Sequence, residues 1–491
     1  MLFLERRKEV ITTGFFNVDK NTIQSVIKQI QQLVFYLLAK PRLEDTEEAR
    51  SFERYRRCAW TSVVMMAMRG SNILIGIVSV PMTLNYLGSD LFGVWMILTS
   101  IIGFASFTDF GMGLGLRNSI IKSAANKDYE SIRLYIWNAI SVLTIVATVI
   151  IGLVLLVLPL IPLDKLIKTS TPETAGIIST ALGGMLIVFA ISLPTHQLLN
   201  IASGLQRAYW GYGVYLIGRV LSFVFICLCV HFRWSFTMLT IGYLGTPTVC
   251  IMLAWIVFFL KAPLYIPRPG KLNKRILKDL FGIGVYSLLH NMAFAILNSS
   301  TIVLIGHTIC AEASVPFSVT QKMFSLPSVF SAALLMGLNV AIGDAWHQHN
   351  IKWIDEAIRR SNRLIWPVVT LAALVFILFG KWLIILWTHN DDALPTMVLL
   401  IICGIKCVVD IYASFFSGFL IGINHVKEVA IYQLTCGCIA IVAGYLIGIL
   451  TQNATWVVFS SLLGALPCAI CYHIRFRNLL KQYRTNNTTV L

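Results

Sequence analysis

The chain has 491 residues, of which 57% are hydrophobic and 13% carry a charge. Soluble globular proteins contain about 25% charged residues, so this composition excludes an ordinary soluble domain and indicates a polytopic helical membrane protein. The sequence has no alternating strand pattern, which argues against a β-barrel, and the expected fold class is all-α.

Residues 1–58 are polar and basic, and no apolar run follows the start, so no cleavable signal peptide is expected. Within them, Thr22–Lys40 has helical periodicity, with apolar residues on one side. This segment is expected to be a cytoplasmic arm that lies on anionic lipid. The alternative is a helix that binds a partner.

Twelve apolar segments follow, and each has a length that suits a tilted helix across a bilayer. They are residues 59–85, 91–112, 134–161, 175–203, 211–232, 236–260, 280–306, 316–343, 364–387, 394–422, 428–450 and 455–474.

The basic residues predict how these segments are oriented. With the N-terminus in the cytoplasm, 31 of the 39 Lys and Arg residues fall on the cytoplasmic side, 3 fall outside and 5 lie within spans. Cytoplasmic loops of membrane proteins are rich in Lys and Arg, so both termini are expected in the cytoplasm. The net charge of +16 then needs no nucleic-acid partner.

The basic stretch 261–279, which contains three prolines, divides the spans six and six. Residues 59–260 are therefore predicted to form an N-lobe, 261–279 a cytoplasmic linker, 280–475 a C-lobe and 476–491 a cytoplasmic tail. The first two spans of each lobe are joined by a short outer turn, and both lobes start on the same side of the membrane. Such a pattern indicates a parallel repeat around a central cavity.

No metal site is expected, because the eleven cysteines lie mostly in apolar spans and Cys468-x-x-Cys471 has no partner pair. There is also no nucleotide-binding pattern of the Walker A type, so no cofactor is predicted.

Several motifs resemble one membrane family. They are VPMTLNYLG from Val80, FGVW from Phe92 and FTDFGMG from Phe107, with weaker echoes in ASGLQR from Ala202 and SGFLIGIN from Ser417. Over about residues 50–475 the chain resembles the polysaccharide exporters of the multidrug/oligosaccharidyl-lipid/polysaccharide (MOP) superfamily. Within them it is most similar to the Wzx-type branch that flips O-antigen and teichoic-acid precursors.

The resemblance implies a flippase with two six-helix lobes in the cytoplasmic (inner) membrane. Its substrate would be an undecaprenyl-pyrophosphate-linked oligosaccharide, carried outward by alternating access. A coupling ion, H⁺ or Na⁺, is implied, as are membrane lipids and a polysaccharide polymerase and glycosyltransferases of the same pathway as partners.

Such a substrate carries an anionic pyrophosphate, so a cationic site inside the membrane is expected. Inserting a cationic side chain into the membrane costs at least about 2.5–3.5 kcal/mol of free energy on insertion scales. Each such residue is therefore a candidate for a functional or structural role. Arg69 in the first span is the first candidate for the phosphate, because an arginine fork suits phosphate oxygens. The alternative for Arg69 is a pairing with a carboxylate or with helix carbonyls between spans. Lys322 and Arg219 are the other candidates for the phosphate, and the alternative for Lys322 is to reach the outer interface.

A second group of residues is predicted to couple or gate. Lys406 and Asp410, spaced i, i+4, are expected to neutralise each other on one helix face, either as a structural pair or as an ion-coupled one. Asp109 could bind the coupling ion, cap the helix break or pair with a cation such as Arg117. Gly111, Gly113 and Gly115 weaken helix order and are predicted to form a hinge.

Two other functions remain open. A multidrug/sodium antiporter of the same superfamily needs acidic residues in its cavity, whereas the buried charges here are mainly basic. A membrane glycan polymerase or ligase needs a sizeable outer loop with catalytic groups, and the expected outer loops are short. No enzyme activity and no catalytic residue is therefore predicted.

Overall fold

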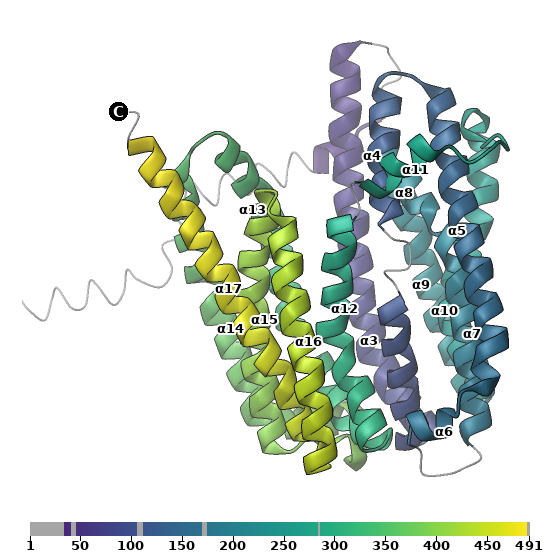
Figure 1. Cartoon of the computed structure of the whole chain (residues 1–491), viewed down its shortest axis with the longest axis vertical. Coiled ribbons are helices and arrows are strands. Elements are labelled where there is room, and N and C mark those ends of the chain that lie inside the picture. Colours follow the sequence, from purple (N-terminus) through teal and green to yellow (C-terminus); the bar gives the residue numbers. More distant parts are fainter. Residues whose placement is uncertain (1–33, 41–45, 106–110, 169–173, 283–284, 489–491) are drawn as a thin grey trace, which may run out of the picture.

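The computed structural model describes residues 34–40, 46–105, 111–168, 174–282 and 285–488, and these are folded into helices and short connections. The N-lobe consists of α3 (Glu47–Ala105), α4 (Met112–Ala125), α5 (Tyr129–Val157), α6 (Leu163–Leu166), α7 (Thr174–Thr195), α8 (Gln197–Gly204), α9 (Ala208–His231) and α10 (Phe236–Lys261). The linker carries α11 (Lys274–Gly282). The C-lobe consists of α12 (Val285–Thr308), α13 (Val315–His347), α14 (Ile351–Thr388), α15 (Met397–Gly422), α16 (Val426–Thr451) and α17 (Ala454–Thr488). Figure 1 shows the two lobes side by side, with α3 and α12 adjacent at their junction.

The described helices account for twelve membrane spans, as the hydropathy pattern predicts. Ten segments are long and apolar enough to cross a bilayer. The first of them, Ser51–Gly103, has 53 residues and is broken at Gly88, where φ is 73° and ψ is 171°. At 1.5 Å per residue it is about 80 Å long, enough for two spans. Helix α13, with 33 residues, also has spanning length. The all-α, two-lobe prediction is confirmed.

Polar side chains at the loop boundaries cap the helices. Asp128 accepts a hydrogen bond from the amide of Ser131 at the start of α5, and Thr396 accepts one from Leu399 at the start of α15. A capping side chain satisfies one of the amides that a helix start leaves without an intrahelical partner. These caps fix the start of α5 at Tyr129 and of α15 at Met397.

Several elements differ in detail from the hydropathy prediction: α3 begins at Glu47, within the predicted arm, and α17 continues to Thr488, through most of the predicted tail. The predicted outer turn after the first span is reduced to the break at Gly88. The fourth span is two helices, α7 and α8, separated at His196, two residues after Pro194. Helix α14 begins at Ile351, within the segment 344–363 that was predicted to be a polar connection. The reason is that polar sequence outside the bilayer can extend a helix without hydrophobic cost.

The two lobes meet at the end that carries α6 and the short helical turns η3 (Glu312–Ser314) and η4 (Asp391–Ala393), here called the closed end. Ser89 donates to an Asp392 carboxylate oxygen at 2.5 Å, and the Asn85 side chain donates to the Thr388 carbonyl at 3.2 Å. The Lys168 ammonium donates to the Thr308 carbonyl at 2.8 Å. In Figure 1 this end is at the bottom, and the lobes diverge toward the other, the linker end.

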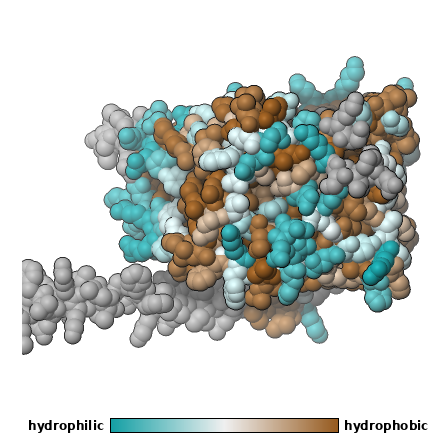
Figure 2. Space-filling model, turned by 90° about the horizontal axis from the view of Figure 1, so that it is seen from below, coloured by the Kyte–Doolittle hydropathy of each residue, from teal (hydrophilic) through white to brown (hydrophobic). Residues whose placement is uncertain are grey.

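Polar and apolar side chains are interspersed over the closed end, which Figure 2 shows face-on. Behind this face, Gly93 of α3 brings the lobes into backbone contact. A Cβ atom on Gly93 would lie 2.2 Å from the carbonyl oxygen of Ala311. Only glycine permits this approach, so the closed end depends on it.

Replacing Gly93 by valine is therefore expected to part the lobes at the closed end. Hydrogen–deuterium exchange should rise in residues 88–93 and 309–316, because their amides become accessible. The matched control is Gly213→Val on α9, where an added Cβ meets nothing within 4 Å. Equal exchange in both variants and in the unmodified protein would contradict the role of Gly93.

Candidate functional site

Three adjoining hollows lie between and within the lobes, and the first is shared by both lobes. It encloses about 350 Å³ and is lined by Arg69 from α3 and Lys322 from α13. Each helix presents a single stripe to it: residues 69, 72, 73, 76 and 77 of α3, and residues 322, 325, 326, 329 and 332 of α13. Spacings of three and four residues place side chains on one helix face. The sequence-predicted cations Arg69 and Lys322 thus line one cavity from opposite lobes.

The second hollow lies in the N-lobe and contains Arg219 of α9. The Nε of Arg219 donates to the Asn72 side-chain oxygen at 3.3 Å, and a terminal nitrogen donates to the Tyr243 hydroxyl at 3.3 Å. The guanidinium carbon also lies 5.0 Å from the centre of the Tyr243 ring, a cation–π distance. Asn72 lines both hollows and is one turn from Arg69, so Arg219 is tied to the shared cavity.

The third hollow lies in the C-lobe, encloses about 370 Å³ and shares Lys322 with the first. Lys406 and Asp410 of α15 line it and form the expected ion pair, with Nζ 2.5 Å from Oδ2. The Lys406 side chain is 10% exposed and that of Asp410 38% exposed. Whether the pair couples an ion or only stabilises α15 stays a prediction.

The polarity of the combined cavity is cationic. Four cationic side chains line the three hollows, and Asp410 is the one acidic residue among the described residues that line them. Since Lys406 is neutralised by Asp410, the excess charge comes from Arg69, Arg219 and Lys322. The arrangement is suited to a phosphate group, which takes several charge-assisted hydrogen bonds.

The other residues predicted to couple or gate are Asp109 and Arg117. Asp109 falls outside the described residues, so its predicted ion-binding role stays a prediction. Arg117 is exposed on α4, at the linker end, and lines none of the three hollows. The predicted gating role of Arg117 therefore stays a prediction.

The glycine run is buried at the start of α4. Gly111 has φ 72°, a left-handed conformation, and directly precedes the helix. A Cβ on Gly115 would lie 2.0 Å from the carbonyl oxygen of Leu280, so Gly115 lets α4 pack closely on α11. Gly113 is buried in the first turn of α4. A hinge at these three glycines stays a prediction.

Two residues that line the cavity, Asn72 and Trp387, were not predicted from the sequence. Asn72 lies three residues after Arg69, and that spacing alone could have identified it as a neighbour on the same face. Trp387 lines the shared hollow, and its indole nitrogen donates to the Ile77 carbonyl at 2.7 Å, joining α14 to α3. No local signal identifies Trp387, because its partner is 310 residues away. Tyr243 of α10 also lines the N-lobe hollow, beside Arg219.

No protein-family model and no curated relative matches the sequence. Solved structures do match. An inward-facing multidrug resistance transporter of the MATE family, MOP superfamily, superposes with a TM-score of 0.67 at 16% identity, covering 84% of this chain and 95% of that one. The outward-facing conformation of a multidrug resistance MATE transporter gives 0.59 at 15% identity, covering 87% and 96%.

A further match is a MOP superfamily transporter from Pyrococcus furiosus, in which reverse polarity of the binding pocket suggests a different function for that protein. Its TM-score is 0.59 at 16% identity, and the match covers 92% of this chain and 98% of that one. The matches extend over nearly the whole length of these transporters. The chain therefore has the two-lobed fold of the MATE transporters of the MOP superfamily.

Proposed function

We propose that this protein is an alternating-access transporter for an anionic amphiphile, with a lipid-linked oligosaccharide pyrophosphate as the substrate class. The single observation that carries the proposal is the position of Arg69 and Lys322. They face one cavity from opposite lobes, and Arg219 joins them through Asn72. A phosphate between the lobes would contact both halves, so its binding energy can couple to their relative motion.

The orientation of the transport path follows from two observations. Among the described residues, the predicted cytoplasmic basic residues gather at the linker end, where the lobes diverge, and the hydrogen bonds of Ser89 and Lys168 between the lobes lie at the closed end. The match to the inward-facing MATE structure also has a higher TM-score than the match to the outward-facing one. We infer that the described conformation is open to the cytoplasm and receives substrate there.

The proposal is tested by reconstituting the full chain in liposomes with a fluorescent undecaprenyl-pyrophosphate oligosaccharide in both leaflets. Transport is read as the change in the fraction that a membrane-impermeant quencher can reach. Faster equilibration than in protein-free liposomes is expected. No acceleration, with the protein correctly inserted, would overturn the lipid-linked substrate.

A second candidate is multidrug/sodium antiport, and the names of the matching MATE structures favour it. Cationic drugs require negative charge in the cavity, whereas Asp410 here is already paired with Lys406. Sodium-driven efflux of ethidium from the same liposomes would support this candidate. Its failure, together with flipping of the pyrophosphate lipid, would separate the two.

The driving force is proposed to be an ion gradient, carried by H⁺ or Na⁺. The Lys406–Asp410 pair is the charged group of the C-lobe cavity that an ion could disturb, because an ion on Asp410 would compete with the Lys406 ammonium. Substrate flipping should then respond to an imposed pH or sodium gradient. We place the protein in the inner membrane with both termini in the cytoplasm.

A further inference from the structure

A separate pocket lies at the linker end of the N-lobe, away from the central cavity. It encloses about 250 Å³ and forms where the beginning of α3, the turn between α8 and α9, and the end of α10 meet. Three basic and three aromatic side chains dominate its lining: Arg57, Arg207, Lys261, Tyr209, Trp210 and Phe258. None of these residues is used by the proposed transport site.

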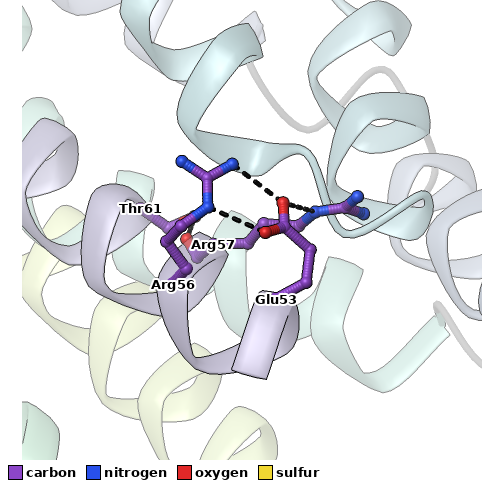
Figure 3. Close-up of polar contacts among 4 residues, drawn as sticks. All are labelled: Glu53, Arg56, Arg57 and Thr61. Carbon is purple, nitrogen blue, oxygen red and sulfur yellow. Dashed lines mark hydrogen bonds and ion pairs between the residues drawn. The ribbon is translucent and has the colours of Figure 1, made fainter. Parts of the chain in front are cut away.

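The terminal nitrogens of Arg57 are available to a ligand because Arg56 already binds both carboxylate oxygens of Glu53. Arg56 holds both carboxylate oxygens of Glu53, with two contacts of 2.8 Å, whereas Arg57 meets that carboxylate through Nε at 3.1 Å. Figure 3 shows Glu53 between the two guanidinium groups, with the terminal nitrogens of Arg57 turned away from the carboxylate. Those nitrogens are the part of the fork that binds phosphate oxygens.

Arg207 reaches the same region from the start of α9. Tyr265, at the end of η2 (Pro263–Tyr265), is influenced by the charges of both Arg207 and Arg57. Burial raises the pKa of its hydroxyl, while Arg207 and Arg57 act in the opposite direction, so both cations lie within electrostatic reach of one side chain. Arg207 also precedes the first turn of α9, and its side chain makes no capping bond there. The amides of such a turn favour a bound anion.

The pocket has an aromatic side, and exposed apolar residues lie close to its lining residues in the chain. The Trp210 and Phe258 rings have centroids 5.9 Å apart, and Trp and Tyr are typical of the bilayer interface. Next to Arg57 and Lys261 in the chain, Trp60 is 38% exposed, Leu260 78% and Leu264 55%. A soluble anion gains nothing from such neighbours, whereas acyl chains do.

We propose that this pocket binds the phosphate group of an anionic phospholipid from the surrounding leaflet, with its acyl chains along Trp60 and Leu260. Basic pockets between membrane helices on the cytoplasmic side suit anionic headgroups, since phosphate pairs with Lys and Arg at the membrane surface. The pocket is formed by α3, α9 and α10. A bound lipid would therefore stabilise the packing of α3, which carries Arg69, against α9 and α10.

Native mass spectrometry of the full chain tests this, with phosphatidylglycerol, phosphatidylcholine and inorganic phosphate as separate probes. Phosphatidylglycerol should bind at least about tenfold more tightly than phosphatidylcholine, and Arg57→Gln/Arg207→Gln should remove that preference, because charged hydrogen bonds are lost. Lysine at both positions should retain most of it. The matched control, Arg54→Gln/Arg359→Gln, removes two exposed charges that do not line the pocket and should bind as the unmodified protein does.

Equal loss in the control pair, or no preference for phosphatidylglycerol, would overturn the proposal. So would binding of inorganic phosphate without binding of phosphatidylglycerol, which would make the pocket a site for a soluble anion. If the double variant fails to fold, Arg207→Gln alone carries the test, because Arg207 is exposed. Arg69→Gln should leave lipid binding unchanged, which separates this site from the transport site.

Discussion

Arg69→Ala is expected to abolish substrate flipping while the protein still inserts and folds. A hydrogen bond to a charged group contributes about 1.5–3 kcal/mol, and this variant removes a fork that can make two of them. Substrate affinity should therefore fall about 10-fold to 100-fold or more. The loss should appear in both binding of the pyrophosphate lipid and its flipping in liposomes, because Arg69 lines the cavity shared by the lobes.

Two substitutions at the same position separate charge from geometry. Arg69→Lys keeps the charge and should retain part of the activity, whereas Arg69→Gln removes the charge and should behave like alanine. The matched control is Lys381→Gln, which removes an exposed cation of α14 that lines none of the three hollows. Full flipping by Arg69→Ala, or an equal loss in Lys381→Gln, would remove Arg69 from the mechanism.

Asp410→Asn is expected to destabilise the protein more than removal of both charges of its ion pair. The variant leaves the buried Lys406 ammonium without its carboxylate, and an unsatisfied buried group costs about 1–3 kcal/mol, with more for a charge. The double variant Lys406→Met/Asp410→Leu replaces the pair by apolar groups, which is often neutral or stabilising. Thermal unfolding in detergent should rank the double variant near the unmodified protein and Asp410→Asn well below it.

Transport by the double variant then decides what the pair does. If it is only structural, flipping and its response to an imposed ion gradient should persist. If it couples the ion, flipping should lose its dependence on the gradient although the fold is intact. A double variant less stable than Asp410→Asn would contradict the ion-pair argument itself.

Part of the candidate site could be predicted from the sequence, because that part depends on geometry within one helix. Arg69 and Lys322 are identifiable as single charges in long apolar runs, and the i, i+4 spacing alone predicts that Lys406 meets Asp410. Asn72 was not predicted, but its spacing of three residues from Arg69 could have identified it in the same way. In each of these cases the helix itself sets which residues share a face.

Contacts between helices could not be predicted from the sequence. Arg219 reaches Asn72 across 147 positions, and Gly93 meets the Ala311 backbone across the lobe boundary. The basic pocket at the linker end combines Arg57 of α3, Arg207 of the turn before α9 and Lys261 of α10, and none of them is unusual where it occurs in the sequence. Such contacts depend on the tilt and rotation of each helix, which neighbouring helices decide.

The sequence by itself therefore determined the all-α class, the twelve spans and the presence of single charges within them, because hydropathy and helical period act locally. Only the tertiary structure decided that Arg69 and Lys322 face one cavity, that the lobes close at one end, and that Arg57, Arg207 and Lys261 line one pocket. The physical reason is that every helix in a bilayer satisfies its own backbone hydrogen bonds. Its partners are then selected by side-chain packing between segments far apart in the chain.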